Sequence, residues 1–139
     1  MNPENARKVP ISPDEWMGHA ESDLRLARLA AGDPFIRREQ VCFHAQQAAE
    51  KAMKAALLAR HIEFPLTHDI EALLQLAEES GLVLPEAVRE AGLLTPYAVQ
   101  TRYPGSWTNI TESDVDEALQ AAEHMLAWVK SMLSTGRGA

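Results

Sequence analysis

Residues His44–Lys54 read HAQQAAEKAMK, a stretch in which alanine alternates with histidine, glutamine, glutamate and lysine. At 100° of rotation per helical residue, Ala45, Ala49, Ala52 and Ala56 fall on one face, where small side chains let a neighbouring backbone approach closely. Small or apolar groups occur almost all round this helix. We therefore predict that it is central in a helical bundle, or that a second subunit covers it again.

Helix start and stop signals continue on both sides of this stretch. Ser12-Pro13-Asp14-Glu15 is a capping box with proline at the first helical position, and Gly32-Asp33-Pro34 ends the same helix. Thr67 and Thr111 are further candidate caps. The predicted helices cover about 13–31, 36–61, 68–79, 85–97 and a last segment after residue 111, and no segment shows sustained strand alternation. The fold prediction is all-α: an up-and-down antiparallel bundle of four to five helices.

The chain's length and termini favour one domain. The 139 residues can bury a core without disulfides, and we place the helical domain at residues 12–133, between a flexible arm (1–11) and a disordered tail (134–139). Cys42 is the single cysteine, which excludes an internal disulfide and fits a reducing cytoplasm. No apolar run is long enough to span a bilayer, and no secretory signal precedes the first helix. We therefore expect a cytoplasmic protein with no membrane contact.

The formal net charge is -7. Binding to duplex nucleic acid depends on a basic surface, so this charge argues against a broad nucleic-acid interface. A small local basic pocket stays compatible with it.

His44, Gln47 and Lys51 fall together on one face of the second helix. If the helix is central, a buried lysine must pair with a carboxylate or open onto a cleft. One interpretation pairs Lys51 with a carboxylate and His44 with a backbone carbonyl. A second places both in a wet cleft that accepts an anion such as a nucleotide phosphate, and a third leaves a plain exposed face. Glu50 and Lys54, in the favourable i,i+4 order, are predicted to form a surface pair.

Three stretches closely resemble the HEPN (higher eukaryote and prokaryote nucleotide-binding) domain. They are FHAQQAAEKAMKAALLARHIEFPLTHDIEALL (43–74), LTPYAVQTRYPG (94–105) and EALQAAEHMLAWVKSML (117–133). The resemblance covers nearly the whole chain, from about residue 14 to residue 133. It implies a helical bundle, a homodimer and, in prokaryotes, a minimal nucleotidyltransferase as partner. Such pairs act in several cases as toxin–antitoxin modules in which the HEPN protein is the toxin.

The resemblance implies two kinds of activity. Many HEPN proteins are metal-independent RNases with an Arg-x4–6-His motif near the start of the final core helix, whereas others bind nucleotides or RNA. Here the matching arginine, Arg102, is followed by no histidine until His124. Arg37 and Arg38 do precede His44 by seven and six positions, but at the start of the second helix, where the motif does not belong. Binding is therefore our main hypothesis, and an endoribonuclease toxin is the alternative.

The candidate nucleotide-binding residues are His44, Gln47, Lys51, Arg102 and Tyr103. Arg102 can fork onto a phosphate while Tyr103 stacks on a base. A structural interpretation is equally open, in which Tyr103 packs on the bundle and Arg102 pairs with a helix C-terminus. In an RNase, His44 would take the 2′-hydroxyl proton and Arg102 or Lys51 would neutralise phosphate charge.

No other chemical motif is evident. The sequence has no HExxH, no cysteine pair and no glycine-rich phosphate loop, so we expect no metal and no cofactor. A third functional hypothesis is a non-catalytic interaction subunit whose polar stripe only meets a partner chain.

Overall fold

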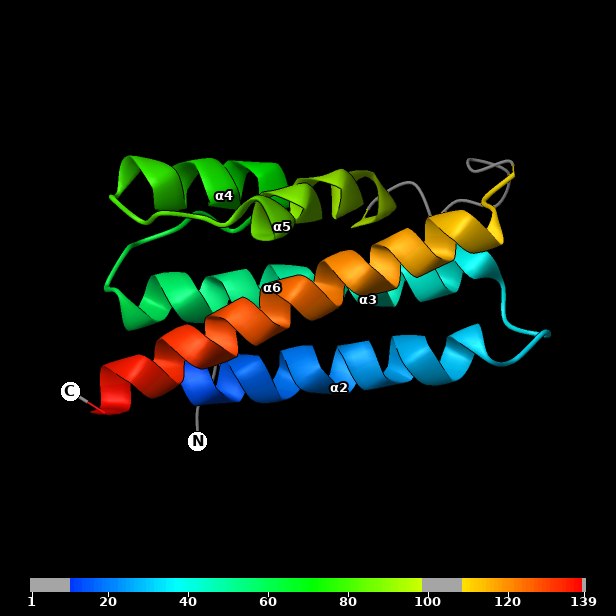
Figure 1. The fold of residues 1–139 in the computed structure, drawn as a ribbon, viewed down its shortest axis with the longest axis horizontal. Helices are drawn as coiled ribbons and strands as arrows, with labels where there is room; N and C mark the ends of the chain where they lie inside the picture. The colour runs from blue at the N-terminus through cyan, green and yellow to red at the C-terminus, as the bar shows by residue number, and fades with distance from the viewer. Residues whose placement is uncertain (1–10, 99–108, 139) are drawn as a thin grey trace, which may run out of the picture.

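The computed structural model describes residues 11–98 and 109–138, in which every regular element is a helix and no strand occurs. The elements are α2 (Pro13–Ala31), α3 (Arg38–Ala59), α4 (Ile70–Glu79), α5 (Glu86–Arg89), the 3-10 helix η1 (Glu90–Ala98) and α6 (Glu112–Gly138) (Figure 1). The predicted all-α bundle is confirmed.

Local capping signals set several helix ends where the sequence predicts them. Ser12 accepts a hydrogen bond from the backbone N–H of Glu15 at the start of α2, and Gly32 follows its end. At α6, Thr111 Oγ1 accepts from the N–H of Asp114 and Asp114 Oδ2 accepts from the N–H of Thr111, which is a reciprocal cap. Each bond satisfies a donor that the first helical turn leaves open.

Three predicted boundaries need correction. The second helix is shorter than predicted, and the cap of α4 is Asp69, whose side chain accepts from the N–H of Ala72, instead of Thr67. The predicted fourth helix is a single α-turn followed by a 3-10 helix. Pro96 lies inside η1, and because its ring nitrogen has no hydrogen to donate, it cannot continue an α-helical ladder.

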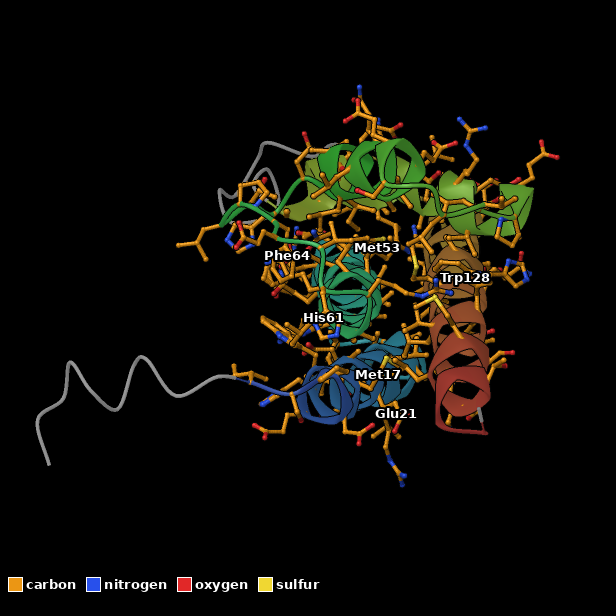
Figure 2. The ribbon with its side chains drawn as sticks, turned by 90° about the vertical axis from the view of Figure 1, so that its left-hand side faces the viewer. Met17, Glu21, Met53, His61, Phe64 and Trp128 are labelled. Carbon is orange, nitrogen blue, oxygen red and sulfur yellow. The ribbon has the colours of Figure 1, made fainter. Side chains whose placement is uncertain are left out.

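The central position predicted for the alanine-rich helix is confirmed. Ala45, Ala49, Ala52 and Ala56 are fully buried. Seen along α3, α2 lies on one side, α4 and α5 lie on the opposite side and α6 covers a third (Figure 2). The fourth side of α3, opposite α6, carries the 60–69 connection and Phe64, and no described helix covers it (Figure 2).

The 60–69 connection gives the bundle its particular order. His68, two residues before α4, contacts Glu50 in the middle of α3, so the chain has turned back along α3 before α4 begins. Glu78 then pairs with Arg89, while the N–H of Glu71 donates to Thr95, which makes α4 antiparallel to the α5–η1 segment. α4 consequently runs in the same direction as α3 (Figure 1), which corrects the predicted antiparallel order of consecutive helices at this step.

The domain bounds stay a prediction, although α6 extends past Leu133 into the predicted tail. In the part of the chain that the structure describes, no helix is long and apolar enough to cross a membrane.

Candidate functional site

The three predicted site residues on α3 lie on its side without a covering helix. At 100° per residue, His44, Gln47, Glu50, Lys51 and Lys54 occupy a sector of about 120°, here called the α3 polar face. The α3 polar face is directed toward the 60–69 connection, because the Lys54 ammonium lies against the ring of Phe64 there. The other two predicted residues, Arg102 and Tyr103, lie outside the described residues, so their convergence with Lys51 stays a prediction.

Lys51 and His44 share one carboxylate from α2. Lys51 Nζ lies 2.6 Å from Asp23 Oδ2, and His44 Nδ1 lies 3.7 Å from Asp23 Oδ1. The expected pairing of Lys51 with a carboxylate is therefore confirmed. The expected bond from His44 to a backbone carbonyl is wrong, because its Nδ1 is buried and has no hydrogen bond within the described residues. The two side chains are still 29% and 25% exposed, so ligand can reach them.

A second polar chain on α3 begins at Glu50. Its Oε1 accepts from Gln46 Nε2 at 3.1 Å and faces His68 Nδ1 at 2.9 Å. Gln46 Nε2 also donates to the carbonyl of His68, and Gln46 Oε1 accepts from Gln47 Nε2 at 2.7 Å. Gln47 at the surface is thereby linked through buried Gln46 to the connection that precedes α4.

Lys54 completes this chain in an unusually enclosed place. Its Nζ lies 3.0 Å from Glu50 Oε2, 5.6 Å from the Trp16 ring centroid and 6.0 Å from that of Phe64. The predicted Glu50–Lys54 pair is confirmed, but the prediction that it lies on the surface is wrong: the side chains are 3% and 8% exposed. Two aromatic faces stabilise the ammonium group here in place of water.

The α3 polar face is electrically balanced. Lys51 is opposite Asp23 and Lys54 is opposite Glu50, so the two ammonium groups and two carboxylates cancel. The face therefore offers hydrogen-bonding groups and little net positive charge, which is a poor match for a bare phosphate but a good one for a polar, uncharged group.

The Arg-x5-His pattern does not form a joint site. Arg38 donates from Nη1 to the carbonyl of Ile110 at 2.9 Å and lies 3.6 Å from Glu112, which ties the start of α3 to the start of α6. Six helical steps place Arg38 about 9 Å along the axis from His44 and on a different side of α3. Arg38 therefore has a structural role at the end of the bundle.

A cavity bordered by described residues lies at that end of the bundle, away from the α3 polar face. It has a volume of about 780 Å³ and is lined by the α2–α3 turn and the start of α6. Its charged lining comprises four carboxylates and two guanidinium groups, from Asp33, Glu39, Glu112 and Asp116 and from Arg37 and Arg38. The excess of carboxylates disfavours an anionic ligand there.

Cys42 and Tyr97 form a buried contact between α3 and η1. Burial raises the pKa of the Cys42 thiol to about 11, and burial together with the nearby thiol raises the pKa of the Tyr97 phenol to about 12. Both groups are therefore neutral near pH 7, which excludes this thiol as an activated nucleophile.

Sequence patterns alone did not indicate Asp23, Gln46 or His68 as parts of the site. Asp23 adjoins the apolar stripe of α2. A carboxylate in that position can pair with a lysine of the neighbouring helix, and this is the signal that could have identified it. Gln46 and His68 offer no comparable signal, because their partners come from the fold. Among the described residues no cluster of three or more potential metal ligands occurs.

Comparison with known proteins gives consistent matches. A family model described as "HEPN domain" matches residues 13–132. The fold is similar to TT1696 from Thermus thermophilus, with a TM-score of 0.72, 33% identity, and coverage of 86% of this chain and 96% of that one. It is also similar to ST0689, an archaeal HEPN homologue, with a TM-score of 0.71, 32% identity, and coverage of 88% and 98%. No curated protein matches the chain.

Proposed function

Because the chain belongs to the HEPN domain family, we propose that it binds a nucleotide or a short single-stranded RNA segment on the α3 polar face. The observation that supports this most directly is the partly exposed pair of His44 and Lys51 on the side of α3 that no described helix covers: Asp23 bonds Lys51 at 2.6 Å and faces His44 Nδ1 at 3.7 Å. Polar side chains fixed by a buried partner are pre-organised, which reduces the entropy lost on binding.

The proposed ligand contacts are His44, Gln47 and Lys51 from α3, together with Arg102 and Tyr103. Arg102 would hold a phosphate with its planar fork, and Tyr103 would stack on a base. The net charge of -7 fits a short ligand held at one place better than a long duplex held along a basic surface.

We further propose that the protein acts as a homodimer in a two-component, toxin–antitoxin-like module with a minimal nucleotidyltransferase. Family membership supports this assignment. Co-expression of the two chains with a tag on one tests it: the expected result is a stable complex in size-exclusion chromatography. Two chains that elute separately at micromolar concentration would contradict the module.

Calorimetric titration with nucleotides and short RNAs tests the binding itself. Lys51→Ala should weaken binding at least about tenfold, which corresponds to losing about 1.4 kcal/mol of interaction. Lys130→Ala is the matched control, because Lys130 also pairs with a carboxylate of α2, Glu21, but at an exposed place on α6. Absence of heat with every nucleotide and RNA, or equal affinities for the two variants and wild type, would reject the proposal.

A metal-independent endoribonuclease is the second candidate, and the position of His44 favours it. Nδ1 faces Asp23, so the accessible Nε2 could take the proton of a ribose 2′-hydroxyl while O2′ attacks phosphorus and the 5′-oxygen leaves with a proton from water. RNA cleaved in the presence of EDTA by wild type but not by His44→Ala would establish this activity. If the protein binds a ligand but does not cleave RNA, the binding hypothesis is supported. If it neither binds nor cleaves but forms a stable complex with its partner, it is a non-catalytic interaction subunit.

A further inference from the structure

The two glutamines of α3 have a fixed orientation, which decides what the surface of the α3 polar face presents. Gln46 Nε2 donates to Glu50 Oε1 and to the carbonyl of His68, and both of these oxygens can only accept. The carboxamide of Gln46 therefore cannot be turned round. Its Oε1 is then an acceptor, and Gln47 must meet it with Nε2 as donor.

Gln47 is left with an outward carbonyl oxygen. One of its two Nε2 hydrogens is donated to Gln46, and its Oε1 has no hydrogen bond in residues 11–98 and 109–138. Among the described residues, His44 Nδ1 is the one buried side-chain nitrogen or oxygen that has no hydrogen-bond partner. Gln47 Oε1 is not such an atom. Because Gln47 is only half-buried, we infer that its Oε1 is the acceptor this residue offers to a ligand.

His44 presents an acceptor by the same reasoning. Its buried Nδ1 faces the Asp23 carboxylate at 3.7 Å, and a carboxylate favours the tautomer with the hydrogen on that nitrogen. In that tautomer the other ring nitrogen, Nε2, carries the lone pair, and the side chain is 29% exposed. His44 and Gln47 are three residues apart on one helix, so their Cβ atoms are about 5–6 Å apart and the two acceptors can meet one ligand edge.

Resting on the proposed function, we propose that the α3 polar face recognises a base edge with two adjacent hydrogen-bond donors, and that the preferred base is guanine. Guanine carries N1–H beside its N2 amino group, whereas adenine and cytosine place their amino group beside an acceptor and uracil has a single ring donor. The lysines of this face cannot read that edge, because an ammonium group only donates hydrogen bonds and two adjacent donors require acceptors.

Pentanucleotides that differ only at the central base test this proposal without changing the phosphate count. We would titrate 5′-labelled rUUGUU, rUUIUU and rUUAUU by fluorescence anisotropy, where inosine (I) lacks the N2 amino group of guanine. Wild type should bind the guanine strand at least about tenfold more tightly than either of the others. Gln47→Leu should reduce that ratio to about threefold or less. Gln75→Leu is the matched control, because Gln75 bonds Glu79 on the exposed face of α4, and it should leave the ratio unchanged.

The outcomes separate this proposal from the proposed function. Equal binding of all three strands, or a guanine preference that persists in a folded Gln47→Leu variant, overturns the base assignment while leaving RNA binding intact. No binding of any strand or nucleotide rejects both. The inosine comparison requires only wild-type protein, so the result does not depend on whether the variant folds, which circular dichroism would establish separately.

Discussion

Lys54 Nζ lies 3.0 Å from Glu50 Oε2, and the two side chains form a nearly buried ion pair between α3 and the 60–69 connection. The Glu50 carboxylate also faces Gln46 and His68, while two rings flank Lys54. The pair therefore connects α3 to α2 and to the 60–69 connection. Because both groups have lost most of their hydration, each charge is stabilised mainly by the other.

Removing one partner of this pair should be costly. Glu50→Leu leaves the Lys54 ammonium without a counter-charge, and we expect the free energy of unfolding to fall by about 3–5 kcal/mol. Urea denaturation measures this. The double variant Glu50→Leu/Lys54→Met should recover much of the loss, and Glu21→Leu, which breaks an exposed pair, should cost less than about 1 kcal/mol. Equal losses in Glu50→Leu and Glu21→Leu would contradict the enclosed pair.

Neutralising Asp23 should change how ligands bind. Asp23→Asn leaves the charge of Lys51 uncompensated, so RNA binding should strengthen and become more dependent on salt. Each added phosphate contact makes the slope of log K against log salt more negative by about 0.7 for a single strand. Glu21→Gln produces the same change in net charge on the same helix and is the control. A salt slope that changes equally in both variants would mean that only overall charge matters.

The Cys42–Tyr97 contact should weaken the protein at alkaline pH. Both acids have a folded-state pKa above the ordinary value, about 11 against 9.0 for the thiol and about 12 against 10.0 for the phenol. The folded protein therefore keeps these protons longer than the unfolded chain, and their stabilising contribution, complete below about pH 9, disappears as pH rises toward 12. Urea midpoints across this interval should fall less steeply for Cys42→Ala and Tyr97→Phe than for wild type.

The cap of α6 should contribute measurably to stability. Thr111→Ala removes the acceptor for the N–H of Asp114, and we expect a loss of about 1 kcal/mol in urea denaturation. Thr135→Ala is the control, because the Thr135 hydroxyl bonds the carbonyl of Ser131 inside the same helix and caps nothing. A loss below about 0.3 kcal/mol for Thr111→Ala would show that packing alone holds this end.

The sequence predicted those parts of the fold that short-range chemistry determines. Ser12 and Gly32 delimit α2 because capping depends on residues within one turn. The central place of α3 followed from small residues all round the helix. The break in the fourth helix was harder to predict because Pro96 is near its end, where an α-helix and a 3-10 helix have similar patterns.

The candidate site was less predictable, for a physical reason. Glu50 and Lys54 have the spacing of a surface pair, and only the packing of Trp16 and Phe64 over them makes the pair buried. The pairing of Lys51 with a carboxylate was predicted as one possibility, but the identity of Asp23 depends on the register between α2 and α3. Gln46 acquires its role from the carbonyl of His68, twenty-two positions later in the chain.

The enclosure of α3 by neighbours on several sides restricts how this helix can diverge among homologues. Deleting one residue between His44 and Lys54 would rotate the two halves of the helix by about 100° relative to each other, so alanines would face water while charged groups entered the core. Change in α3 should therefore proceed by replacement at fixed length. Insertions and deletions should accumulate instead in the turns at 32–37 and 80–85, which a length comparison of aligned family members can check.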